Sequence, residues 1–128
     1  MSKTCIIAEH DPWDIRLLRI YAERFGFRLC QAFDGTDVLR LAHTEQPDVI
    51  ILDGELPGAL RGAVLLQALK ADHATRDIPV VLFSWFDDGM TFGLGVETPI
   101  RLQKPATYKA FEAAMADAGI ERKIAADL

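Results

Sequence analysis

The apolar run over residues 49–52 is the feature that most constrains the fold of this chain. Four aliphatic residues in succession leave no polar face, which is typical of a strand buried on both sides of a parallel sheet. Asp53 ends the run, and Gly54, Pro57 and Gly58 mark a loop after it. Ligands bind at the carboxyl ends of strands in open α/β sheets, so Asp53 is a candidate site residue. Aspartate also favours turns, and this segment alone does not separate the two interpretations.

Strand-like and helix-like segments alternate along the rest of the chain. Short apolar or alternating runs predict five strands, over residues 4–8, 27–33, 48–52, 78–83 and 100–103. Apolar residues at helical spacing predict helices over residues 12–25, 36–46, 63–71 and 108–119. The alternation predicts an α/β protein whose parallel sheet is covered by helices on both faces.

Local signals mark several element boundaries. Asp11 suits the N-cap of the first helix, Pro12 its first position, and Asp14 its first turn, while Gly26 suits its end. Residues 34–35, Asp-Gly, predict a turn. The boundaries of the first helix are therefore the most strongly marked.

One segment, over residues 87–99, departs from the pattern because it contains Gly89, Gly93 and Gly95. Each glycine inside a helix costs roughly 1 kcal/mol relative to alanine. Only a short or irregular helix is therefore expected there.

The length of 128 residues and an apolar content of 50% predict a single domain over residues 1–128, with a core over about 4–119. The tail over residues 120–128 is expected to be frayed. Cys5 and Cys30 lie in apolar surroundings without C-x-x-C spacing, so both are expected to be buried, reduced thiols.

Charge and hydropathy exclude several classes of partner. The net charge of −5 and the lack of a basic run argue against direct nucleic-acid binding. No apolar run approaches the roughly 20 residues that span a membrane. The N-terminus lacks the pattern of a signal peptide, so a cytoplasmic location is expected.

Polar residues follow the predicted strands at their carboxyl ends. Glu9 and His10 follow the first strand, Asp53 the third, Ser84 the fourth and Lys104 the fifth. Parallel strands place these ends on one edge of the sheet, so the side chains are expected to meet there. A lysine and a hydroxyl can bind phosphate oxygens, and clustered carboxylates can hold a divalent cation. The set therefore suggests phosphoryl chemistry around Asp53.

Four landmarks in order resemble the response regulator receiver domains of bacterial two-component signalling. They are an acidic cluster before Pro12, the segment P-D-V-I-I-L-D ending at Asp53, the segment I-P-V-V-L-F-S ending at Ser84, and the Lys-Pro pair at 104–105. Together they are specific, and the resemblance covers residues 5–119. It implies a flavodoxin-like, three-layer α/β/α fold with five parallel strands in the order 2-1-3-4-5.

The resemblance also implies roles for the site residues. Asp53 would accept a phosphoryl group from a histidine kinase or phosphotransfer partner, Lys104 would pair with it, and Ser84 would hydrogen-bond it and move with it. Mg²⁺ would bind Asp53, the acidic pair after the first strand and the backbone carbonyl of Glu55. Such a domain is a signalling module rather than an enzyme. It acts by binding a downstream protein, and homodimerisation near residues 87–99 is left open.

Three positions depart from the family pattern. His10 stands where the second acid of the metal-binding pair is expected, and imidazole is a poor ligand for Mg²⁺. Either the site is weak, or it takes a softer ion such as Mn²⁺ or Zn²⁺, or a protonated His10 replaces part of the cation charge; Glu9 could still ligate. Trp85 replaces a small residue and either covers the site or anchors the loop. Arg101 replaces an aromatic switch residue, and its charge resists burial.

These residues leave two functions in competition. A phosphoacceptor receiver without an output domain is favoured because Asp53, Ser84 and Lys104 are all present. The alternative is a pseudo-receiver, a phosphorylation-independent interaction module, which His10, Trp85, Arg101 and the glycines of residues 87–99 would suit. An enzyme that binds FMN or a nucleotide is disfavoured, because the loop after the first strand carries acids and no glycine.

Overall fold

A single parallel sheet organises the computed structural model, which describes residues 3–56, 62–85 and 100–121. Its strands are β1 (Lys3–Ala8), β2 (Phe27–Ala32), β3 (Val49–Asp53), β4 (Val80–Ser84) and β5 (Ile100–Gln103). The helices of the described residues are α1 (Pro12–Phe25), α2 (Gly35–Glu45), α3 (Gly62–Ala71) and α4 (Tyr108–Asp117). The strand order β2-β1-β3-β4-β5 confirms the predicted flavodoxin-like topology.

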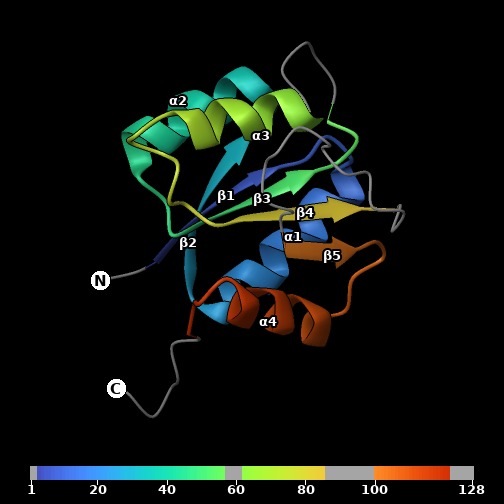
Figure 1. The fold of residues 1–128 in the computed structure, drawn as a ribbon. Coiled ribbons are helices and arrows are strands. Elements are labelled where there is room, and N and C mark those ends of the chain that lie inside the picture. The colour runs from blue at the N-terminus through green and yellow to red at the C-terminus, as the bar shows by residue number, and fades with distance from the viewer. Residues whose placement is uncertain (1–2, 57–61, 86–99, 122–128) are drawn as a thin grey trace.

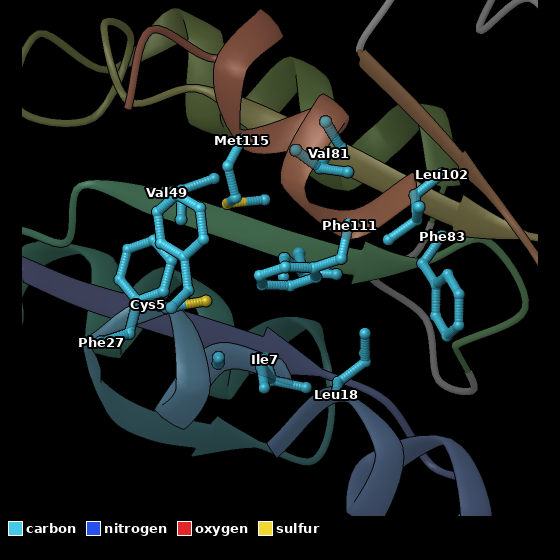
Figure 2. Close-up of a cluster of buried hydrophobic side chains, with 14 of the residues drawn as sticks. Cys5, Ile7, Leu18, Phe27, Val49, Val81, Phe83, Leu102, Phe111 and Met115 are labelled. Atoms are coloured by element: carbon cyan, nitrogen blue, oxygen red, sulfur yellow. The ribbon is translucent and has the colours of Figure 1, made fainter. Parts of the chain in front are cut away.

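Helices cover both faces of the sheet, as the sequence predicts. Helices α2 and α3 lie together on one face, and α1 and α4 lie on the other (Figure 1). Two apolar clusters follow from this arrangement. One packs the α1 and α4 side chains, including Leu18 and Phe111, against the sheet, as Figure 2 shows. The other packs α2 and α3, including Val38 and Leu66, against the opposite face. Every residue of β3 is buried, so the central strand is enclosed on both sides.

Capping residues explain where the helices begin and end. The Asp11 carboxylate accepts two N–H groups of the first turn of α1, at 2.8 and 3.4 Å. Gly26 ends α1 in the left-handed conformation, with φ of 109°. Asp34 was expected in a turn, but its carboxylate accepts the N–H of Asp37 at 2.9 Å, so it is the N-cap of α2. An aspartate carboxylate accepts a nearby backbone N–H both in turns and at helix N-caps, so the Asp-Gly sequence alone does not distinguish the two.

Two strand boundaries bear on the site. The strand predicted over 48–52 runs one residue later, so Asp53 is the last residue of β3. The strand predicted over 78–83 begins at Val80, because Pro79 has no N–H for the ladder, and ends at Ser84. The candidate acceptor and hydroxyl are therefore held by strand hydrogen bonding rather than by loops.

The prediction of two buried thiols is wrong for one of them. Cys5, in β1, is fully buried, whereas Cys30 is partly exposed, and both are free. The difference arises because β2 lies at the edge of the sheet. The Cys30 Sγ lies 3.8 Å from Glu45 Oε1, beside a charged side chain rather than inside the core.

The first residue of the predicted tail packs into the core and is not frayed. Ile120 is buried, and its N–H donates to the Met115 carbonyl at 2.9 Å. Residues 122–128 and the glycine-rich segment 87–99 lie outside the described residues, so the expectations for them stay predictions. Within the described part of the chain, no helix has the length and apolar character needed to cross a membrane.

Candidate functional site

Asp53 lies fully buried at the middle of the carboxyl edge of the sheet. Lys104 Nζ and the Glu55 N–H both donate to its Oδ1 at 3.0 Å. His10 Nδ1 lies 2.7 Å from its Oδ2. Burial raises the pKa of Asp53, but hydrogen bonds with Glu55, Glu9 and Lys104 outweigh this and lower it to about 2. Asp53 is therefore an ionised carboxylate at neutral pH.

Lys104 places one buried ammonium group among four carboxylates. Its Nζ lies 3.0 Å from Asp53, 3.2 Å from Glu9, 3.3 Å from Asp14 and 3.6 Å from Glu55. Burial lowers the pKa of Lys104, but its contacts with Asp53 and Glu9 prevail and hold it above its ordinary value. Asp14 was not predicted as a site residue. The available signal was its place in the first turn of the helix that follows β1.

Glu9 is a fully buried acid that follows β1. Its Oε1 accepts the N–H groups of His10 at 2.9 Å and Asp11 at 3.1 Å. Burial and the neighbouring Asp53 raise the pKa of Glu9 to about 7. Its Oε2 lies 3.2 Å from Lys104 Nζ but has no hydrogen-bond partner. Glu9 Oε2 is thus held by an ion pair with Lys104 and by no hydrogen bond, so this oxygen could also ligate a cation.

Glu55 enters the site through its side chain. Ser84 Oγ donates to its Oε1 at 3.2 Å, and its Oε2 lies 3.6 Å from Lys104 Nζ without a hydrogen bond. Burial and the hydrogen bond with Asp53 raise the pKa of Glu55. The sequence predicted only its backbone carbonyl as a metal ligand, and that role stays a prediction. The carboxylate was missed because its direction depends on the loop after β3.

Glu9, His10 and Asp53 form a group of potential metal ligands. One ligand atom from each lies within 4.8 Å of the others. His10 Nδ1 is 2.7 Å from Asp53 Oδ2 and 3.5 Å from Glu9 Oε1. The Oε2 atoms of Glu9 and Glu55 pair with Lys104 but accept no hydrogen bond, and together with them these donors suit a divalent cation.

Comparisons with known proteins agree with this geometry. The family model of the response regulator receiver domain matches residues 5–116. The chain belongs to the response regulator receiver family. Receiver domains are signalling modules of two-component systems, as the sequence landmarks implied.

The match to this receiver domain covers different shares of its curated relatives. The response regulator GtcR of Aneurinibacillus migulanus is 32% identical over 107 residues, which are 82% of this chain and 43% of GtcR. The polar-differentiation response regulator DivK of Brucella ovis is 31% identical over 86 residues, 67% of this chain and 69% of DivK. The matched segment therefore covers less than half the length of GtcR. Among solved structures, the bacteriophytochrome response regulator RtBRR has a TM-score of 0.79 at 29% identity, covering 97% of this chain and 82% of that one.

Gly54 permits a close approach inside the receiver site. A Cβ atom at this position would lie 3.0 Å from both Cβ and Oγ of Ser84, which is tighter than nine in ten real Cβ contacts. The Gly54 N–H also donates to the Phe83 carbonyl at 2.9 Å, which ties the loop after β3 to β4. Because Gly54 has no side chain, the loop that follows Asp53 can pass close to Ser84.

Two departures from the family pattern lie at the end of β4 and within β5. Trp85 follows Ser84 directly and is 54% exposed, so it is not packed into the core. Arg101 is half-buried in β5, where it pairs in register with Leu82 of β4. The receiver domain therefore has a charged side chain, Arg101, at the position of the family's aromatic switch residue.

Proposed function

We propose that Asp53 accepts a phosphoryl group from a phosphohistidine donor and that the phosphorylated domain signals by binding another protein. The observation that carries this proposal is the buried Asp53 carboxylate, 3.0 Å from Lys104 Nζ. A carboxylate attacks only when it is ionised, and the lowered pKa of Asp53 keeps it so. Phosphorylation is also a general feature of the family.

The transfer uses groups that the site already holds. An Asp53 oxygen attacks phosphorus while the P–N bond of the donor breaks, which leaves an aspartyl phosphate and a free imidazole. Lys104 then pairs with a phosphoryl oxygen, and Ser84 Oγ turns from Glu55 to hydrogen-bond another. A bound divalent cation would neutralise further charge on the phosphoryl oxygens.

Glu9, His10 and Asp53 would hold that cation, and the backbone carbonyl of Glu55 is a further proposed ligand. The two carboxylates support this assignment, since Glu9 Oε2 accepts no hydrogen bond. Mg²⁺ is the ion that the family generally binds, and Mn²⁺ is the alternative because His10 adds a nitrogen donor.

The proposed phosphodonor is a histidine kinase or a phosphotransfer protein. The proposed output is contact in the cytoplasm with a target protein or with a second copy of the chain. Family membership supports both assignments.

Intact mass spectrometry after incubation with acetyl phosphate tests the proposal, with Mg²⁺ and Mn²⁺ used separately. We expect the wild type to gain one phosphoryl group and Asp53→Asn to gain none. A wild type that gains no mass with either ion would favour the phosphorylation-independent interaction module. Mass gained equally by Asp53→Asn would show that another residue is the acceptor.

A further inference from the structure

His10 Nδ1 is spaced from its neighbours like one ligand of a shared metal ion. It lies 2.7 Å from Asp53 Oδ2 and 3.5 Å from Glu9 Oε1. Adjacent ligands around an octahedral ion with bonds of about 2.1 Å are about 3.0 Å apart. These two distances lie on either side of this value, and one ligand atom of each residue lies within 4.8 Å of the others, so one cation can be shared by all three residues.

The ring is also available to a cation from solvent. His10 Nδ1 points at Asp53 and lies within hydrogen-bonding distance of its Oδ2, at 2.7 Å. A cation held between the two atoms would replace that contact, bound through the lone pair of Nδ1. The His10 side chain is 46% exposed, so a hydrated ion can reach the ring. The fully buried Glu9 carboxylate provides an oxygen donor beside the ring, with its Oε1 3.5 Å from His10 Nδ1.

The nitrogen atom decides which ion is preferred. Carboxylates suit both Mg²⁺ and Mn²⁺, so Glu9 and Asp53 discriminate weakly between them. Mg²⁺ prefers oxygen ligands and releases water reluctantly, whereas first-row transition ions accept imidazole. We infer that His10 Nδ1 is a direct ligand that gives this site a preference for a first-row transition ion over Mg²⁺, an inference that rests on the function proposed above.

Titration with Mn²⁺ followed by electron paramagnetic resonance, with Mg²⁺ as competitor, tests this preference. The wild type is compared with His10→Asp, which restores an oxygen donor, and with His10→Asn, which does so without a charge. We expect the ratio of Mn²⁺ to Mg²⁺ affinity to be about tenfold or more higher in the wild type than in either variant. Ratios that agree within about threefold in all three proteins would overturn the inference.

Pulsed electron paramagnetic resonance of the Mn²⁺ complex gives a second readout. The wild type is expected to show a histidine nitrogen coupled to Mn²⁺, and His10→Asp is expected to lose that signal. His43, whose Nε2 lies 2.6 Å from Asp72, offers the control variant His43→Ala, which should keep the signal. A signal that persists in His10→Asp, or disappears in His43→Ala, would overturn the inference.

Phosphorylation is measured separately in the same proteins. Nitrogen ligation without mass gain on Asp53 would support the inference and refute the proposed function. Phosphorylation of Asp53 in Mg²⁺ without nitrogen ligation would support the function and refute the inference.

Discussion

Replacing Glu9 by glutamine is expected to stabilise the folded protein above pH 7 far more than at pH 5. Burial and the neighbouring Asp53 raise the pKa of Glu9 from 4.5 to about 7 in the folded protein. The unfolded chain ionises Glu9 at the lower value, so the wild type loses stability as the pH rises through this window. Glutamine resembles the protonated acid: it can accept the same two N–H groups but carries no charge that must be buried.

The size of this effect follows from the two pKa values. A change of one pKa unit corresponds to about 1.4 kcal/mol, so the full loss in the wild type is about 3 kcal/mol. In a domain of this length, a loss of that size lowers the melting temperature by about 10 °C. Asp53 acts in the opposite direction, because its lowered pKa contributes stability that is lost as the pH falls from 3.8 toward about 2. That effect lies below pH 5, outside the range measured, so it adds nothing to the change of the difference with pH.

Urea denaturation in metal-free buffer from pH 5 to pH 9 measures the difference. The stability of Glu9→Gln minus that of the wild type is expected to grow by about 2–3 kcal/mol over this range. Glu23→Gln, on the exposed side of α1, controls for the loss of one negative charge. A difference that stays constant or shrinks as the pH rises would refute the assignment of a raised pKa to Glu9.

Three further substitutions test other parts of the structure. Gly54→Ala would place a Cβ 3.0 Å from Ser84 and is expected to lower the free energy of unfolding by about 1–3 kcal/mol in urea, whereas an unchanged midpoint would contradict the close contact. Asp14→Asn removes one of four carboxylates around Lys104. At pH 9, where Glu9 and Glu55 are ionised as well as Asp53, these three carboxylates lie no more than about 7 Å from Asp14, so their combined repulsion exceeds the attraction of Lys104 at 3.3 Å. Its melting temperature should rise by a few degrees at low salt and less in concentrated salt, and a fall would contradict this reasoning. Phe111→Ala empties a fully buried position and is expected to cost about 3–5 kcal/mol by denaturation, with a loss below about 1 kcal/mol contradicting its place in the core.

The meeting of the site residues could be predicted because they stand at strand ends. Apolar runs locate those ends, and parallel strands share one carboxyl edge, so Glu9, Asp53, Ser84 and Lys104 had to approach one another. The role of Asp11 as a helix cap could also be predicted, because its hydrogen bonds are to residues close in the sequence. Sequence patterns succeed where the determining contact is local or follows from topology.

Side-chain direction and packing between elements could not be predicted in the same way. Asp14 meets Lys104 only because α1 begins over the end of a distant strand. The Glu55 carboxylate reaches Ser84 through the conformation of a loop. Cys30 is partly exposed because its strand lies at the edge of the sheet, which its own neighbours in sequence do not reveal.

Locating the phosphoryl group tests the central claim most directly. The protein is treated with acetyl phosphate, reduced with borohydride, which converts an aspartyl phosphate to homoserine, and sequenced as peptides by tandem mass spectrometry. The account predicts homoserine at position 53 and unmodified side chains at Glu9, Asp14 and Glu55. Modification of one of those acids, or phosphate on His10, with Asp53 intact, would contradict it.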